Sequence, residues 1–134
     1  RETLRQALAS AELAPGDIGY VNAHATATTG GDVIESDAIR SVFGTGSGAP
    51  AVSSTKGVHG HLLGATSALE AVITLAAIRT STLPATAHLD QIDPKCALNH
   101  IPGEAATGTK IAHALSFSCG FGGTNAALIL SSAT

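Results

Sequence analysis

SSTKGVHGHLLGATSALEAVITLAAI, residues 53–78, is the stretch that decides the fold. A lysine and two histidines stand directly before a run in which nearly every position is apolar or small. Such a run predicts a helix over residues 62–78, and because it shows no polar face we expect it to be buried on all sides. A brief strand at 51–53 precedes the motif, so the polar residues are expected at a strand-to-helix junction.

Helical and strand patterns alternate through the rest of the chain. The expected helices cover residues 1–13 and 32–43, and the expected strands cover 18–23, 111–117 and 126–130. The last two strands are expected to pair antiparallel around a glycine loop, with both faces of the final strand covered. Residues 82–108 contain three prolines and are expected to cross the surface with little regular structure. These patterns predict an α/β domain with a mixed sheet and a buried central helix.

Composition narrows the possible partners. A chain of 134 residues is long enough for one domain with a real core. The net charge is −3 and the seven basic residues are scattered, so we expect neither nucleic acid nor a membrane surface as a partner. Two cysteines without metal-type spacing indicate a reducing compartment. The chain opens with Arg1 in a helical pattern, so we expect a piece of a longer protein, and no segment is expected to target or span a membrane.

The first polar cluster is NAHATAT, residues 22–28. It places His24 just beyond a strand end, where site residues of α/β folds gather, although a structural histidine would fit there equally well. Asp32 then stands where a helix N-cap belongs, and Glu35 three residues later can complete a capping box. Glu35 is also a candidate ion-pair partner for Lys56.

The second cluster is the opening motif. His61 is expected near the first turn of the long helix, where the helix dipole favours the neutral imidazole as a hydrogen-bond donor. A neutral donor suits a reaction in which negative charge builds on a carbonyl oxygen, and Lys56 would hold a positive charge nearby. Two alternatives stay open. In one, Lys56 extends to solvent and His61 caps amides. In the other, His59 and His61 bind zinc with His24 or Asp32, a set that no second spaced pair supports.

The third cluster is SCGFGGTN, residues 118–125. It leads from one strand into another, so we expect a mobile loop that presents backbone N–H groups and not a phosphate-binding loop. Cys119 and Cys96 are candidate nucleophiles, but neither stands at a helix N-terminus, where the pKa of a thiol falls.

Together, and in this order, the three clusters resemble the C-terminal half of the β-ketoacyl-acyl carrier protein synthases, the elongating condensing enzymes of fatty acid synthesis. The resemblance covers essentially the whole chain. It implies a thiolase-like αβαβα fold in which residues 1–134 form the C-terminal domain and the nucleophilic cysteine lies in an absent N-terminal half. The chain departs from the family pattern at Ala25, His59 and Cys119, which replace a glycine, a threonine and an aromatic residue.

The resemblance implies a decarboxylative Claisen condensation of malonyl-acyl carrier protein with an enzyme-bound acyl thioester. In that reaction His24 and His61 would bind the malonyl thioester and stabilise its enolate, and Lys56 would orient them. Glu35 would anchor Lys56, supported by Asp32. The loop with Cys119, Phe121, Gly122 and Gly123 would gate the acyl pocket and supply an oxyanion N–H. Glu70 would lie near a structural cation.

The resemblance further implies an acyltransferase without a cofactor, because its substrates are carried on the phosphopantetheine of acyl carrier protein. The expected assembly is a homodimer of complete chains, soluble in the bacterial cytoplasm or an organellar matrix. Two alternatives remain. One is a non-catalytic partner like the chain-length factors of polyketide synthases. The other is a structural fragment, inactive alone, whose long helix exposes apolar surface.

Overall fold

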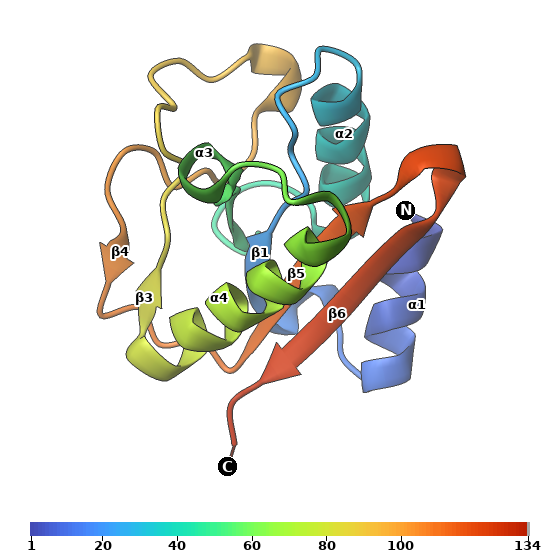
Figure 1. Cartoon of the computed structure of the whole chain (residues 1–134). Helices are drawn as coiled ribbons and strands as arrows, with labels where there is room; N and C mark the ends of the chain where they lie inside the picture. Colours follow the sequence, from blue (N-terminus) through green and yellow to red (C-terminus); the bar gives the residue numbers. More distant parts are fainter. Residues whose placement is uncertain (134) are drawn as a thin grey trace.

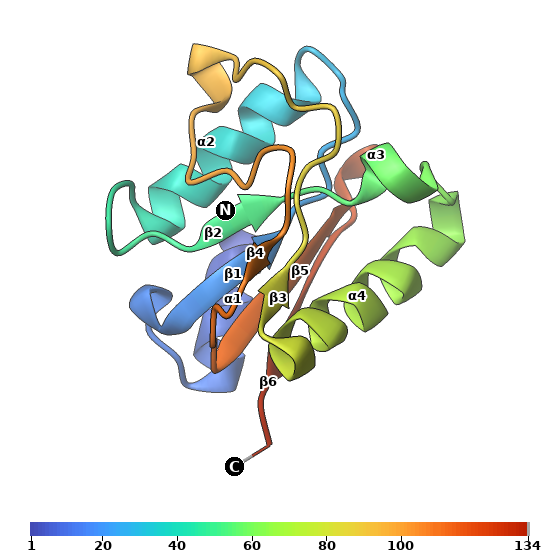
Figure 2. The same cartoon turned by 90° about the vertical axis from the view of Figure 1, so that its left-hand side faces the viewer.

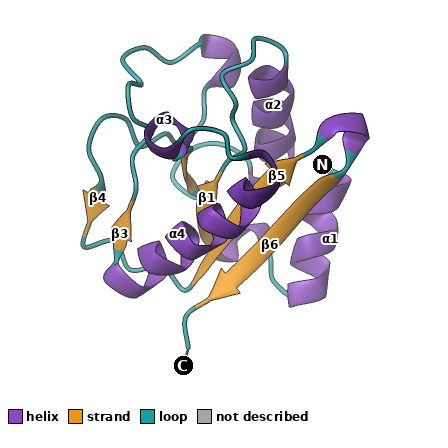
Figure 3. Ribbon diagram, in the orientation of Figure 1, coloured by secondary structure: helices purple, strands orange, loops and turns teal. Residues whose placement is uncertain are grey.

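The computed structural model of this chain describes residues 1–133. Helices cover both faces of a four-stranded sheet, and a two-stranded ribbon lies beside it (Figures 1 and 3). The elements are α1 (Glu2–Ala11), β1 (Ile18–Asn22), α2 (Gly31–Phe43), β2 (Ala51–Ser53), α3 (Lys56–His59), α4 (Thr66–Thr80), β3 (Thr82–Leu83), β4 (Ala106–Thr107), β5 (His113–Cys119) and β6 (Asn125–Ser131). Every strand and long helix predicted from the sequence is present.

The main sheet has the strand order β2-β1-β5-β6. β1 is parallel to both β2 and β5, so these three strands end at one edge of the sheet, where α3 and the loop before α2 begin (Figure 2). β5 and β6 pair antiparallel in unbroken register from His113 opposite Ser131 to Cys119 opposite Asn125, which confirms the predicted hairpin.

The prediction that both faces of the final strand are covered is wrong for the described chain. β6 is an edge strand, and Leu128 on it is 49% exposed. The apolar run that suggested two covered faces therefore belongs to an edge strand, and one of its flanks has no strand beside it within residues 1–133.

The sheet separates two apolar clusters because neighbouring side chains of a strand point to opposite faces. On β1, Val21 packs against α1 and α2, and Tyr20 packs against α4. The first cluster contains Leu4, Leu8, Ile18, Val21, Ile39, Phe43, Val52, Leu115 and Phe117. The second contains Tyr20, Ala77, Ile78, Leu83, Ile101 and Ala114.

α4 differs from the prediction of a helix buried on all sides. Its buried face carries Thr66, Glu70, Thr74, Ala77 and Ile78, whereas Val72 on the opposite face is 64% exposed. The helix rests on one face of a single sheet, and no element described here covers its outer side (Figure 2). The helix itself provides the hydrogen-bond partner of one of these buried polar residues. The Thr74 hydroxyl donates to the Glu70 carbonyl at 2.7 Å.

By length and composition alone, residues 63–80 are apolar enough to cross a membrane. This is weak evidence, because the core helices of soluble proteins have the same composition. The prediction that no segment spans a membrane stays a prediction.

Residues 82–108 form the expected irregular excursion. Their only regular pieces are β3, β4 and a short turn at Pro94–Cys96. The excursion returns along β2, where the Val52 N–H donates to the Asn99 carbonyl at 2.8 Å and the Ile101 N–H donates to the Val52 carbonyl at 3.1 Å. These bonds give hydrogen-bond partners to the N–H and carbonyl groups of Val52 on the outer edge of β2.

Candidate active site

His24 and His61 lie together at the carboxyl edge of the sheet. Their ring centroids are 5.3 Å apart and the rings meet edge to face at 86°. His24 lies just after the end of β1, and the parallel strand β2 leads into α3 and the loop that carries His61. Parallel pairing of β1 and β2 therefore brings the two clusters predicted from the sequence into one site.

His61 lies outside the long helix, which corrects its predicted position. Gly60, at φ 73°, ends α3, and a turn at Leu63–Ala65 separates His61 from α4. The Leu63 N–H donates to His61 Nδ1 at 3.3 Å, and the Thr66 hydroxyl lies 3.1 Å from the same nitrogen. A backbone N–H can only donate, so Nδ1 is the acceptor and the neutral ring carries its proton on Nε2. These two contacts, and not a helix N-terminus, form the local surroundings of the His61 ring, and its role as a donor stays a prediction.

His24 is half-buried, and three effects lower the pKa of its imidazole to about 4. Burial is the largest, followed by the Lys56 charge and then by His61. Because the pKa lies well below neutrality, His24 is an uncharged imidazole at pH 7. Its Nδ1 is buried and has no hydrogen-bond partner within residues 1–133.

Lys56 is buried and forms an ion pair with Glu70, with Nζ 2.5 Å from Oε1. The prediction that Glu35 pairs with Lys56 is therefore wrong, as is the alternative in which Lys56 extends to solvent. Glu70 projects from the inner face of α4, and its side chain is fully buried. The ammonium of Lys56 is thus the counter-ion of the carboxylate that was expected beside a structural cation.

Glu35 binds the backbone of the His24 loop. Its Oε1 accepts the His24 N–H at 2.7 Å and its Oε2 accepts the Ala25 N–H at 2.8 Å. Burial raises the pKa of Glu35 to about 7, with a smaller contribution from Asp32, while the two N–H donors and Lys56 oppose the rise. The predicted capping box is wrong, because α2 begins one residue before Asp32 with Gly30 as its N-cap. Asp32 instead accepts the Thr28 N–H at 3.4 Å.

Residues 1–90 match the family described as "Beta-ketoacyl synthase, C-terminal domain". The chain belongs to this family.

Curated relatives and solved structures agree with this assignment. The 3-oxoacyl-acyl-carrier-protein synthase 2 of Coxiella burnetii is 45% identical over 128 residues, which cover 96% of this chain and 31% of the relative. The Staphylococcus aureus protein of the same name is 42% identical over 126 residues, covering 94% of this chain and 31% of the relative. The β-ketoacyl synthase domain described here therefore spans about a third of their length.

Two solved structures share the fold closely. A β-ketoacyl synthase from Burkholderia phymatum superimposes with a TM-score of 0.90 at 39% identity, over 97% of this chain and 31% of that one. The ishigamide ketosynthase/chain length factor superimposes with a TM-score of 0.93 at 34% identity, over 98% of this chain and 32% of that one. The predicted thiolase-like fold is confirmed.

The glycine loop of this β-ketoacyl synthase domain follows β5 and turns at Phe121–Gly123. Gly122 and Gly123 have φ values of 74° and 81°, a conformation that favours glycine. Phe121 is 96% exposed, so the predicted gating side chain points to solvent in this chain. Burial, followed by the Glu35 charge, raises the pKa of the Cys119 thiol to about 11, which disfavours a nucleophilic thiolate there.

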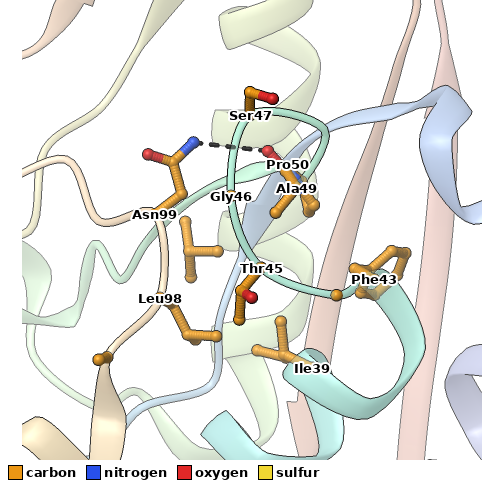
Figure 4. A pocket seen from close by; sticks show the side chains of 12 residues that line it. Ile39, Phe43, Thr45, Gly46, Ser47, Ala49, Pro50, Leu98 and Asn99 are labelled. Carbon is orange, nitrogen blue, oxygen red and sulfur yellow. Dashed lines mark hydrogen bonds between the residues drawn. The ribbon is translucent and has the colours of Figure 1, made fainter.

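A cavity of about 220 Å³ adjoins His24, and its walls include Thr26, Glu35, Phe117 and Cys119. A larger cavity, of about 490 Å³, lies at the other end of α2 between Ile39, Phe43 and Leu98 (Figure 4). Of the two histidines, only His24 lines the smaller cavity and neither lines the larger one, so the smaller cavity is the candidate substrate space.

The metal alternative finds no support within residues 1–133, where no group of three or more His, Cys, Asp or Glu side chains could hold an ion. Both ring nitrogens of His59 are engaged locally, with Nε2 2.9 Å from the Thr55 hydroxyl and Nδ1 2.7 Å from the Gly60 carbonyl. Cys96, the other candidate nucleophile, is half-buried in the turn at Pro94–Cys96, which packs against α2.

Sequence reasoning missed two residues of the site, Thr66 and Ser54. Thr66 contacts His61, and the Ser54 hydroxyl donates to the Ala25 carbonyl at 3.3 Å. Hydroxyl residues are common throughout this chain. Only the SSTK motif itself could have drawn attention to Ser54.

Proposed function

We propose that this domain supplies the malonyl-binding part of an elongating β-ketoacyl-acyl carrier protein synthase. The observation that carries the proposal is the pair of adjacent imidazoles, one fixed as an Nε2–H donor and the other held neutral by burial and by Lys56. Relatives named 3-oxoacyl-acyl-carrier-protein synthase 2 at 42% and 45% identity support the reaction class.

Decarboxylation is the first step that these residues would assist. The bond between the malonyl carboxylate and the α-carbon breaks, carbon dioxide leaves, and the electron pair moves into the thioester as an enolate. Negative charge then builds on the thioester oxygen, where His24 and His61 would donate hydrogen bonds. Donors preorganised in a partly buried site stabilise this charge more than they stabilise the uncharged substrate, and that difference lowers the barrier.

Condensation follows when the enolate carbon attacks the carbonyl of an acyl thioester. A new carbon–carbon bond forms, the carbon–sulfur bond breaks, and a cysteine thiolate leaves. We assign that cysteine to the remaining two thirds of a complete synthase. The raised pKa of Cys119 keeps its thiol protonated near neutral pH, so Cys119 is a poor nucleophile. Lys56 would supply fixed positive charge beside the reacting groups, and an N–H of the glycine loop would bind the second oxyanion.

The proposed partner is acyl carrier protein, which would present both acyl groups on its phosphopantetheine, so no further cofactor is needed. A similar solved structure, described as a type II polyketide synthase acyl-carrier protein in complex with its ketosynthase, supports this class of partner. The complete enzyme would be a soluble homodimer in the cytoplasm or an organellar matrix.

A second candidate is a non-catalytic subunit resembling a chain-length factor. The TM-score of 0.93 to the ishigamide ketosynthase/chain length factor favours it, as does the loss of the gating aromatic at Cys119. The two candidates differ in what they require of the histidines, because a non-catalytic subunit needs neither of them for condensation.

The test uses the native gene product, whose intact mass is measured first. A mass of about three times 13.2 kDa is expected if this domain is part of a complete synthase. Condensation of malonyl-acyl carrier protein is then assayed for His24→Ala and His61→Ala, with Ser41→Ala as the control because its hydroxyl bonds only to its own helix. We expect each histidine variant to lose at least about 10²-fold in kcat. No condensation by the wild-type gene product would support the non-catalytic subunit instead. Wild-type rates in both histidine variants would overturn the proposed roles of His24 and His61.

A further inference from the structure

The residue that follows His24 has an unusual backbone conformation. Ala25 has a φ of 23°, which lies on the left-handed side where residues with a β-carbon rarely occur. An alanine stays in such a conformation only when the surrounding structure holds it there. The contacts of the Ala25 peptide groups therefore show what fixes the start of this loop.

Two buried side chains hold Ala25 from opposite sides. Glu35 of α2 accepts its N–H at 2.8 Å, and Ser54, just after β2, donates to its carbonyl at 3.3 Å. Glu35 is 7% exposed and Ser54 is 5% exposed. The second oxygen of Glu35 accepts the His24 N–H at 2.7 Å, so both peptide groups bonded to the His24 Cα are restrained.

We propose that Glu35 and Ser54 are positioning residues: they hold Ala25 in its left-handed conformation and thereby fix the direction of the His24 imidazole. No hydrogen bond joins either side chain to the ring within residues 1–133, so both act through the backbone. This inference rests on the proposed function only in giving His24 a part in the reaction.

The geometry also separates this role from an electrostatic one. Glu35 forms no ion pair with Lys56 among the described residues, since the Lys56 ammonium is bound to Glu70. Ser54 carries no charge, yet it holds the same residue, Ala25, through the carbonyl on its other side. If substitution of either residue has the same effect on catalysis, the cause is therefore the Ala25 backbone and not the charge of Glu35.

The experiment is a double-mutant cycle in the native gene product with Ala25→Gly. Ser54→Ala and Glu35→Gln are each made with and without Ala25→Gly, and kcat and KM for malonyl-acyl carrier protein are measured. Glycine adopts the left-handed conformation without steric cost, so it should need the two holding contacts less. We expect each single variant to lose about tenfold or more in kcat with little change in KM, and at least about threefold of that loss to disappear with Ala25→Gly. Equal losses in both backgrounds would overturn the proposal.

A second measurement does not depend on activity. The pKa of His24 is followed by NMR through its ring protons in wild type, Ser54→Ala and the Ser54→Ala/Ala25→Gly pair, with Ser41→Ala as the control. A loosened loop exposes the ring, so the His24 pKa should rise from about 4 in Ser54→Ala and fall back when Ala25→Gly is added. An unchanged His24 pKa in Ser54→Ala would overturn the proposal. If wild type lacks condensation activity, the proposed function fails while this titration still decides the positioning role.

Discussion

At the scale of single residues, burial sets the protonation states of the site more than formal charge does. His24 and Glu35 are joined through one backbone N–H, yet burial shifts their pKa values in opposite directions, to about 4 and about 7. In both cases burial disfavours the charged form, which is the protonated imidazole and the ionised carboxylate. The uncharged forms of these two side chains are therefore favoured, that of His24 above about pH 4 and that of Glu35 below about pH 7.

The shift of His24 can be separated into its causes by titration. In a Lys56→Met/Glu70→Gln variant the positive neighbour is removed without leaving a buried carboxylate unpaired. We expect the His24 pKa to rise above 4 but to stay below its ordinary value, because burial is the larger cause. NMR titration of the ring protons measures this. A pKa at the ordinary value near 6.5 would show that Lys56, and not burial, dominates.

The same two residues predict opposite dependences of stability on pH. The pKa of Glu35 is raised in the folded state, so the folded state binds more protons than the unfolded one between about pH 4.5 and 7, and this contribution to stability is lost as pH rises. The pKa of His24 is lowered, so its contribution grows as pH rises from about 4 to 6.5.

Urea unfolding at a series of pH values tests both signs. The difference in unfolding free energy between wild type and Glu35→Gln should shift against wild type from pH 4.5 to 7. The difference in unfolding free energy between wild type and His24→Asn should shift in favour of wild type from pH 4 to 6.5. Two flat difference curves would show that neither pKa is perturbed.

At the scale of elements, the Lys56 and Glu70 pair joins α3 to α4. Their side chains are 6% and 0% exposed, so removing one partner leaves a buried charge without compensation. We expect Glu70→Ala to lower the unfolding free energy by about 3–5 kcal/mol. Lys56→Met/Glu70→Leu should cost much less, because no charge remains buried. Chemical denaturation of the three proteins measures the difference, and equal losses in both variants would contradict the assignment.

At the scale of the whole molecule, the described chain leaves apolar surface and polar groups without partners on the α4 side. Val58, Leu63 and Val72 are between 64% and 78% exposed. Buried side-chain atoms of Asn22, His24 and Glu70 lack hydrogen-bond partners within residues 1–133. Folded proteins seldom leave both kinds of group uncompensated, so we expect further protein atoms or water to complete this side.

The 134-residue chain alone should therefore associate or bind an apolar dye. Val72→Lys combined with Leu63→Lys should reduce dye fluorescence and raise solubility, because both side chains are on the exposed surface. Sedimentation and dye titration measure the outcome, with Leu4→Lys as a contrast that should unfold the chain because Leu4 is fully buried. A monomer that binds no dye would show that this surface needs no cover.

The sequence by itself determined the order and type of the elements and the β5–β6 hairpin, since periodicity and strand-end position are local properties of the chain. Parallel pairing of β1 and β2 then brought His24 and His61 into one site. Tertiary structure alone decided which polar groups pair. Lys56 binds Glu70 and not Glu35 because α4 turns its Glu70 side inward, while Glu35 is held by the backbone of the His24 loop. Tertiary structure also decided which sides of α4 and β6 are covered, because burial depends on what lies beside an element in space. The same apolar sequence occurs whether or not a neighbouring element covers it.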